Sequence, residues 1–328
     1  MSDLRDMAAL SHRFCVAPMM DWTDRHDRAF LRQFTRHALL YTEMLGTGAL
    51  VHGDAAGLLR FSAVEQPLAA QLGGGVPDEL AAAAVKARQA GYREVNLNVG
   101  CPSDRVRGGN FGACLMKEPA RVARCVAAMK AAVDIPVTVK CRIGVDGRDS
   151  EAELFDFIDQ VAAAGCGTFI IHARIAILEG LTPKQNREIP PLRHERVFRV
   201  KQAFPGLGII INGGIETLEF AAELLREVDG VMLGREAYRN PWLLSEVDER
   251  FFGARANTRT RLDALRGFLP YIEDELRAGT PLRHISRHML GLFKGQRGGR
   301  RFRQHLSTHG NRREASITVL HDAMALVS

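Results

Sequence analysis

Side chains able to hold a planar ligand occur within short apolar runs of this sequence. Lys140, His172 and Gln71 lie in three different runs of this kind. A lysine or histidine in an apolar strand is costly to bury unless it has a partner. A planar polar ligand would supply such partners: Lys140 would stabilise negative charge on a reduced ring, and Gln71 would hydrogen-bond a ring edge. A purely structural role for His172 is the alternative.

Two glycine-containing turns indicate a place for a phosphate group. Asn212-Gly213-Gly214 and Gly234-Arg235 each end a short apolar run. Glycines let backbone N–H groups approach a phosphate, and a helix N-terminus that follows adds a partial positive charge. Arg235 adds a planar cation that matches phosphate oxygens. The two turns together favour phosphate binding, although each one alone could be a simple tight turn.

The six cysteines are scattered singly along the chain. No two of them form a Cys-x-x-Cys pair, which argues against a zinc knuckle and against a thioredoxin-type couple. No cluster of His, Asp and Glu has ligand spacing either, so we expect no metal. Cys101 follows Asn98-Val99-Gly100 at the end of an apolar run. We expect most of the cysteines to be small buried hydrophobic residues, the common state of free cysteine, and the five other than Cys101 to have buried or packing roles.

The elements that must position these residues alternate along the chain. Short apolar, β-branched runs alternate with Ala-rich helical stretches, which predicts an α/β fold, a (β/α)₈ TIM barrel. A doubly wound sheet is the alternative, but it usually has fewer strands and a G-x-G-x-x-G turn after the first. The predicted strands are 14–19, 39–45, 68–73, 94–101, 137–144, 168–173, 208–214 and 230–235, and the clearest helices are 77–91, 118–132, 150–165 and 216–228.

A barrel of this kind carries its functional residues at the carboxyl ends of its strands. The same rim would therefore bring together the polar residues that end at least six of the apolar runs. They are Pro18-Met19-Met20, Gln71, Asn98 with Cys101, Lys140 with Arg142, His172, Asn212-Gly213-Gly214 and Gly234-Arg235.

The strand pattern stops after residue 253. The remaining sequence predicts a linker and helix over 254–279, a helix over 284–296, and further helical segments over 300–308 and 314–326. We therefore predict two domains, a catalytic barrel over residues 1–253 and a small all-helical domain over residues 254–328.

Positive charge is concentrated in the second predicted domain. Between Pro281 and Arg313 the chain has nine Lys and Arg and no Asp or Glu, whereas the net charge of the whole protein is +6. Such clustering is typical of a surface that binds a phosphate backbone. A solvated helix face or a flexible basic tail is the alternative. The nine cations are Arg283, Arg287, Lys294, Arg297, Arg300, Arg301, Arg303, Arg312 and Arg313.

Composition and the N-terminal sequence bear on location. Hydrophobic residues make up 46% and charged residues 25% of the chain, as in ordinary globular proteins. No apolar run reaches the roughly 18 residues of a membrane helix, and the first residues lack the apolar core of a secretory signal. We expect a cytoplasmic monomer without membrane contact.

Residues 95–116, VNLNVGCPSDRVRGGNFGACLM, resemble the signature of the tRNA-dihydrouridine synthases. The matching features are Asn-x-Gly-Cys-Pro, an aliphatic Val106, and Gly112-Ala113 at the family's spacing. Further matches follow in order: APMM with Thr23-Asp24, TEM at 42–44, Gln71, VKCRIG at 139–144, His172-Ala173-Arg174, NGG and GR. Residues 181–192 (LTPKQNREIPPL) and 299–307 (GRRFRQHLS) resemble the A-type bacterial branch.

The resemblance implies FMN in a TIM barrel, a helical C-terminal domain, NADPH as electron donor, and reduction of tRNA uridines at positions 20 and 20a. It also implies that Asn98 and Arg142 face the uracil, and that tRNA contacts fall on Lys184, Arg187, Arg300 and Arg303. The implied FMN contacts are Pro18, Met19, Met20, Gln71, Lys140, His172, Asn212, Gly213, Gly214, Gly234 and Arg235.

For such a reaction we expect a hydride from N5 of the flavin to reach uracil C6 and a proton from Cys101 to reach C5. A thiol with an ordinary pKa of about 8.5 is mostly protonated at neutral pH, as an acid must be. One alternative is a flavin enzyme for free pyrimidines, which would not need the basic segment. The other is a non-catalytic RNA-binding barrel, which would not explain Cys101, Lys140 and His172 on one rim.

Overall fold

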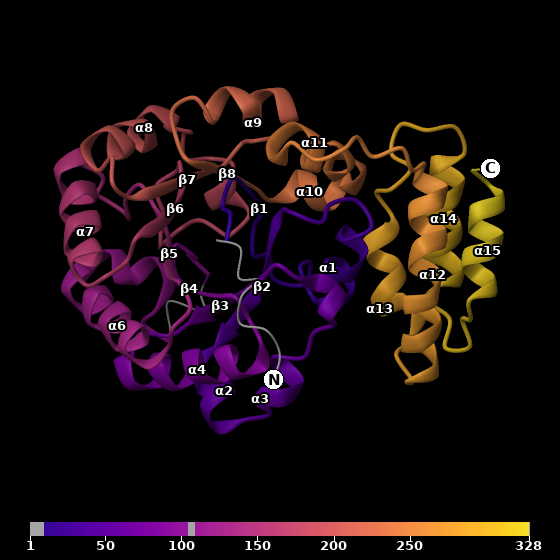
Figure 1. Cartoon of the computed structure of the whole chain (residues 1–328), viewed down its shortest axis with the longest axis horizontal. Coiled ribbons are helices and arrows are strands. Elements are labelled where there is room, and N and C mark those ends of the chain that lie inside the picture. Colours follow the sequence, from indigo (N-terminus) through magenta and orange to yellow (C-terminus); the bar gives the residue numbers. More distant parts are fainter. Residues whose placement is uncertain (1–9, 104–108, 328) are drawn as a thin grey trace.

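Eight parallel strands close into a barrel in the computed structural model, which describes residues 10–103 and 109–327. The strands pair in chain order, and β1 also pairs with β8, with Phe14 beside Val231. Figure 1 shows this ring with helices around it. The strands are β1 (Phe14–Val16), β2 (Leu39–Gly46), β3 (Leu68–Gly73), β4 (Glu94–Val99), β5 (Val137–Arg142), β6 (Thr168–His172), β7 (Gly208–Asn212) and β8 (Gly230–Leu233).

The longer helices of the barrel begin where their sequences favour a helix start. Proline occupies the first turn of α4 (Pro77–Ala90) and α6 (Pro119–Ala132), and Ser150 caps α7 (Glu151–Ala163) in a capping box with Glu153. The other barrel helices are α1 (Arg25–Leu31), α2 (Thr47–His52), α3 (Ala55–Leu58), α8 (His194–Ala203), α9 (Leu218–Leu224), α10 (Arg235–Arg239) and α11 (Val247–Phe252).

The predicted alternation of strands and helices is confirmed, and six of the eight strands end earlier than their apolar runs, the exceptions being β2 and β3. The first run extends to residue 19, but β1 ends at Val16. Pro18, Met19 and Met20 therefore lie in the turn between β1 and α1. The helix predicted over 216–228 is likewise shorter, because α9 begins after the Thr217 cap and ends at Leu224.

Two apolar clusters stabilise the fold. The larger one fills the space between strands and helices and continues into the C-terminal helices, where Phe268 and Phe302 are fully buried. The smaller one fills the inside of the barrel and includes Cys15, Leu39, Tyr41, Ile170, Ile210 and Met232. Polar residues are buried as well, among them Glu94, Asn96 and Thr138.

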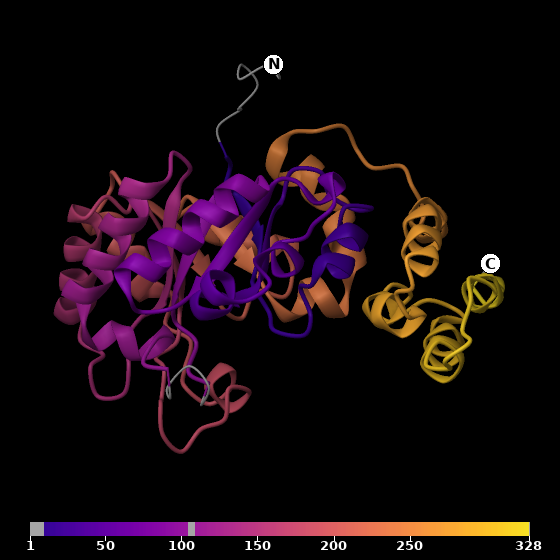
Figure 2. The same cartoon turned by 90° about the horizontal axis from the view of Figure 1, so that it is seen from below.

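The C-terminal helices pack beside the barrel, as Figures 1 and 2 both show. They are α12 (Arg261–Arg277), α13 (Leu282–Ser286), α14 (Gly299–His309) and α15 (Thr318–Ala325). The single helix predicted over 284–296 is wrong: α13 ends at Ser286, and a 3₁₀ turn, η5 (Arg287–Met289), and further turns follow. Gly291 allows a close approach there, since a Cβ would lie 2.4 Å from the Arg239 carbonyl oxygen.

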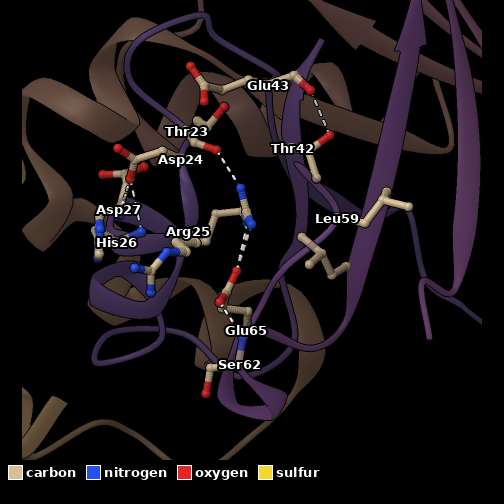
Figure 3. A network of polar contacts seen from close by, with 12 residues as sticks. Thr23, Asp24, Arg25, His26, Asp27, Thr42, Glu43, Leu59, Ser62 and Glu65 are labelled. Atoms are coloured by element: carbon tan, nitrogen blue, oxygen red, sulfur yellow. Dashed lines mark hydrogen bonds and ion pairs between the residues drawn. The ribbon is translucent and has the colours of Figure 1, made fainter. Parts of the chain in front are cut away.

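Ion pairs and aromatic contacts attach these helices to α1. Arg25 forms a two-pronged ion pair with the Glu275 carboxylate on α12. Asp24, the N-cap of α1, accepts a hydrogen bond from Arg287 at 2.5 Å. Figure 3 shows the barrel side of this contact, with Asp24 and Arg25 close together. Phe268 of α12 packs against the aromatic ring of Phe30, with centroids 5.2 Å apart.

Among the described residues, no helix is long and apolar enough to cross a membrane. Within the same residues, no group of His, Cys, Asp and Glu side chains is arranged to hold a metal ion.

Candidate active site

Lys140, His172 and Asn212 meet at the carboxyl ends of β5, β6 and β7. Lys140 Nζ donates to Asn212 Oδ1 at 3.1 Å, and His172 lies beside Asn212 in the strand register. Desolvation, followed by the charge of Arg142, lowers the pKa of Lys140 to about 8. Desolvation and the charges of Arg142 and Lys140 hold the pKa of His172 well below its ordinary value. The imidazole is therefore neutral and the ammonium is easily discharged.

His172 Nδ1 is buried and has no hydrogen-bond partner among the described residues. Buried polar atoms are nearly always paired, so an orphaned nitrogen at a rim indicates a partner from outside the chain. The adjacent Lys140 is a desolvated cation, which a negatively charged ligand would stabilise. These two groups fit the polar, electron-accepting ring of a flavin.

The turn after β7 places two consecutive glycines, whose backbone carries no side chain, at the same rim. Gly213 and Gly214 have φ of +115° and +71°, which other residues rarely adopt. A Cβ on Gly214 would also lie 2.4 Å from Leu192 Cδ1. The next helix, α9, starts only after Thr217 and is short, so the expected contribution of a helix N-terminus is smaller than the sequence suggests.

The Gly234-Arg235 turn lies at the end of β8, near the turn after β1. A Cβ on Gly234 would make ordinary contact with Met19 Sδ at 3.8 Å, so space does not demand glycine. Arg235 donates to the Glu188 carboxylate at 2.9 Å, and Glu188 belongs to the segment after β6. A phosphate at this turn would compete with Glu188 for the guanidinium.

The turn between β1 and α1 is held by hydrogen bonds that involve Thr23 and Arg28. Met19 N–H donates to Thr23 Oγ1 at 2.9 Å, and Met20 is 47% exposed. Arg28 donates to the Thr23 carbonyl at 2.7 Å and forms a buried ion pair with Glu65 at 2.8 Å. Figure 3 shows Thr23 and Glu65 on either side of this contact. The methionines are therefore presented at the rim by a rigid support.

Asn98 holds the turn that carries Cys101. Its Oδ1 accepts hydrogen bonds from the backbone N–H groups of Gly100 and Cys101, at 3.1 and 3.0 Å. Its Nδ2 donates to Gln71 Oε1 at 2.8 Å. The sequence suggested a contact between Asn98 and a substrate, but these bonds leave one N–H of its amide for such a contact. The turn-forming role was missed because it depends on the folded backbone.

Cys101 differs from the buried thiols. Its side chain is partly exposed, and Sγ lies 3.5 Å from Ser103 Oγ. Burial raises the pKa of Cys125 to about 11 and of Cys141 and Cys166 to about 12, so those thiols stay protonated. Of the other five cysteines, four are buried, and Cys114 is partly buried and packs against the larger apolar cluster.

Arg142 ties the Cys101 turn to the segment after β6. Its Nε donates to the Gly100 carbonyl at 3.0 Å, and its Nη1 donates to the carbonyls of Ile175 and Asn186, both at 3.0 Å. Desolvation lowers the pKa of Arg142 to about 10. Two of its three nitrogens thus hold backbone, which leaves Nη2 as the nitrogen for a ligand. Sequence reasoning gave Arg142 only a substrate role.

The candidate tRNA-binding residues lie in two places. Lys184 and Arg187 are exposed in the segment after β6, around the 3₁₀ turn η3 (Gln185–Arg187), which extends beyond the barrel in Figure 2. Arg300 and Arg303 are exposed on α14, among the C-terminal helices and apart from the ring of strands in Figure 1. The structure therefore brings the first pair to the rim and leaves the second pair beside the barrel.

The nine cations of the basic segment are not all uncompensated. Arg287 pairs with Asp24, and Lys294 lies 3.4 Å from the Glu236 carboxylate, both on the barrel. For the other seven, no ion pair is found with an acidic group among the described residues. The sequence count missed these two pairs because their acidic partners are far away in the chain.

Comparison with known proteins agrees with the signature around Cys101. The model of the family described as dihydrouridine synthase matches residues 15–328. The chain is 59% identical, over 98% of its length and 97% of the relative, to a tRNA-dihydrouridine(20/20a) synthase of Pseudomonas aeruginosa. Proteins of the same name from Shewanella oneidensis and Salmonella typhimurium are 54% and 53% identical, over 97% and 99% of this chain and 95% and 98% of theirs.

Of the signature residues, Val106 lies outside the described part of the chain. The Asn98-to-Pro102 turn, the Gly112-Ala113 pair and the polar residues at the strand ends lie within it. The family model covers residues 15–328, which include nearly the whole eight-stranded barrel and the C-terminal helices. The chain belongs to the dihydrouridine synthase family.

Proposed function

We propose that this chain reduces uridines 20 and 20a of tRNA to dihydrouridine, with FMN at the barrel rim and NADPH as the electron donor, and that it acts as a monomer. The observation that carries the proposal is the meeting of Cys101, Lys140 and His172 on one rim, with His172 Nδ1 lacking a partner among the described residues. The names of the relatives support the two tRNA positions.

The residues at the rim fit FMN by their chemistry. The orphaned His172 Nδ1 and the Lys140 ammonium would contact the flavin ring, and Lys140 would stabilise its negative charge when reduced. Reduced FMN, when bound, supplies the hydride for C6 of uracil. The proposed FMN contacts are Pro18, Met19, Met20, Gln71, Lys140, His172, Asn212, Gly213, Gly214, Gly234 and Arg235.

The chain's own residues handle the base and its proton. Asn98 holds the turn on which Cys101 is partly exposed, so the thiol can deliver a proton to C5. The Nη2 group of Arg142 and the remaining N–H of Asn98 would bind the polar edge of the base and stabilise charge at O4. Arg142 also orders the segment that carries Lys184 and Arg187, through the Asn186 carbonyl.

The target base must leave its stack to reach Cys101, which costs a few kcal/mol. Phosphate contacts can hold the tRNA while the base moves, because they position the backbone without reading sequence. Lys184 and Arg187 would serve this purpose beside the rim, and Arg300 and Arg303 from α14.

The proton-donor role is tested by Cys101→Ala. We expect the rate of dihydrouridine formation in unmodified tRNA to fall by about 100- to 10,000-fold, the usual value of a general acid. Bound flavin and tRNA affinity should stay as in the wild type. Cys125→Ala, which removes a buried thiol from α6, is the control and should keep the rate. A Cys101→Ala enzyme with a wild-type rate would show that another group donates the proton.

The remaining parts of the proposal have their own tests. The modified positions are tested by mapping dihydrouridine in tRNA from a deletion strain. We expect dihydrouridine at positions 20 and 20a to be absent from that strain and to return when this chain is expressed in it. Comparable turnover of free uridine would assign the chain to pyrimidine metabolism instead. A colourless protein that releases no flavin on denaturation would remove FMN from the proposal.

A further inference from the structure

A chain of buried hydrogen bonds runs along the inside of the barrel, from the rim with Cys101 to the opposite end. Glu94, Asn96 and Asn98 alternate along β4, so their side chains share the inner face. Gln71 of β3 and Thr138 of β5 lie on either side of Asn96 in the strand register. The three residues at the core of the chain, Glu94, Asn96 and Thr138, are at most 1% exposed.

The bonds follow one another without a gap. Thr138 Oγ1 donates to Glu94 Oε1 at 2.6 Å, and Asn96 Nδ2 donates to Thr138 Oγ1 at 2.8 Å. Gln71 Nε2 donates to Asn96 Oδ1 at 2.9 Å, and Asn98 Nδ2 donates to Gln71 Oε1 at 2.8 Å. The last link is the pair of bonds that Asn98 Oδ1 accepts from the Cys101 turn. We call this series the barrel relay.

The groups at both ends of the barrel relay require its hydrogen bonds to be donated in the same direction, from Asn98 towards Glu94. A carboxylate can only accept, so the Thr138 hydroxyl must donate to Glu94 and accept from Asn96. At the rim, backbone N–H groups can only donate, so Asn98 must turn its oxygen towards Cys101 and its nitrogen towards Gln71. A rotated amide at Gln71 or Asn96 would place like groups together on both sides. Each amide therefore has one permitted orientation.

Glu94 is firmly held at the far end. Its Oε1 also accepts from the Tyr41 hydroxyl at 2.8 Å, and its Oε2 lies 2.5 Å from His12 Nε2. Burial raises the pKa of Tyr41 well above its ordinary value, so that hydroxyl remains a donor. The strand between Glu94 and Asn98 rises about 13 Å, which places Glu94 well away from any ligand at the rim.

We propose that Glu94, Thr138 and Asn96 are positioning residues for the active site: through the barrel relay they fix the amides of Gln71 and Asn98, and through Asn98 the backbone of Cys101. The inference rests on the proposed function for the statement that this rim is catalytic. It predicts that a change far from any substrate alters the Cys101 turn.

Two substitutions of Thr138 separate this role from packing. Thr138→Val keeps the branched shape and removes the hydroxyl, whereas Thr138→Ser keeps the hydroxyl and removes a methyl group. The relay predicts that the valine variant is impaired and the serine variant is close to wild type, while a packing role predicts the reverse order. Tyr41→Phe is the matched control, because it removes a hydrogen bond to the same Glu94 oxygen without interrupting the relay.

The first measurement is amide hydrogen exchange at Gly100 and Cys101 in the cofactor-free protein. Thr138→Val should exchange about fivefold faster or more than Tyr41→Phe, as expected when an opening equilibrium loses one ordinary hydrogen bond. The second is single-turnover reduction of tRNA, which should slow by about 10- to 100-fold with tRNA affinity unchanged, as misplacement of a reacting group would cause.

Equal exchange in Thr138→Val and Tyr41→Phe, or a serine variant worse than the valine variant, would overturn the inference. If Thr138→Val does not fold, Glu94→Gln takes its place, because a carboxamide has a donor as well as an acceptor and so removes the constraint at the far end of the relay. Exchange no faster than in Tyr41→Phe would then overturn the inference. If the wild type forms no dihydrouridine, the proposed function fails, and the exchange measurement still decides whether the relay holds the Cys101 turn.

Discussion

At the scale of single residues, the lowered pKa of Lys140 leads us to expect that ligand binding depends on pH. Its pKa is lowered to about 8, so the ammonium is charged below that pH and loses its attraction for an anionic ligand above it. We expect the affinity of the cofactor-free protein for FMN, measured by flavin fluorescence quenching, to fall as the pH rises from about 7 to about 9. The flavin phosphate keeps its charge in this range because its second pKa is near 6.

Lys140→Gln is the control for that titration. It should bind FMN about tenfold more weakly at neutral pH, as the loss of a hydrogen bond from a charged group implies. Its affinity should then be constant between about pH 7 and about pH 9. A variant that keeps the wild-type pH profile would assign the titration to another group.

The sequence predicted where the candidate residues lie but not what they touch. Lys140 and His172 could be placed on one rim because parallel strands present their carboxyl ends together. The bonds from Asn98 to the Cys101 turn, and from Arg142 to three backbone carbonyls, depend on strand register and on how loops return. No local pattern encodes those distances, so both residues were given only ligand roles.

At the scale of elements, the exposed arginines of helix α14 lead us to expect that tRNA binding depends on salt concentration. Arg300 and Arg303 are exposed on this helix and show no ion pair among the described residues. Arg300→Glu with Arg303→Glu should weaken tRNA binding and reduce the slope of log affinity against log salt by about 1 per lost phosphate contact. Filter binding across a salt series measures both quantities.

A charge-matched control is available on α12. Arg266→Glu with Arg277→Glu makes the same change in net charge, but these arginines already pair with Asp263 and Asp274 on their own helix. The control should keep most of the affinity and slope. If both double variants behave alike, net charge rather than the α14 surface attracts the tRNA.

Helices and strands were predicted well where the hydrophobic periodicity was strong. They were predicted poorly where contacts between distant segments determine where an element ends. All eight apolar runs became strands, because alternating β-branched and helical segments leave few other folds. The helix expected over 284–296 ends at Ser286, and Gly291 lies close against the Arg239 carbonyl of the barrel. Such a contact between distant segments has no local signal.

At the scale of the whole molecule, the contact between barrel and C-terminal helices should be acid-sensitive. The hydrogen bond from Arg25 is the main cause that lowers the pKa of Glu275 to about 2. An unfolded glutamate titrates near 4.3, so the stabilisation is complete above about pH 4.3 and is lost as the pH falls towards about 2. The ionised Glu275 carboxylate stabilises the folded protein because its ion pair with Arg25 exists only in the folded state.

Glu275→Gln tests this contribution through the melting temperature. The variant should melt about 2–4 °C below the wild type at neutral pH, and the difference should shrink as the pH is lowered to about 3. A difference that stays constant with pH would mean that the carboxylate acts by its shape rather than by its charge.

The closed barrel also dictates an order of events during synthesis. β1 needs β8 as a partner, yet Val231 is translated long after Phe14. At the usual speed of a ribosome, the first strand waits on the order of 10–40 s for its second neighbour. Until then its apolar residues have one open edge, which chaperones can occupy and other nascent chains can pair with. Slow translation between β1 and β8 should therefore lower the yield of native protein while leaving the finished enzyme unchanged.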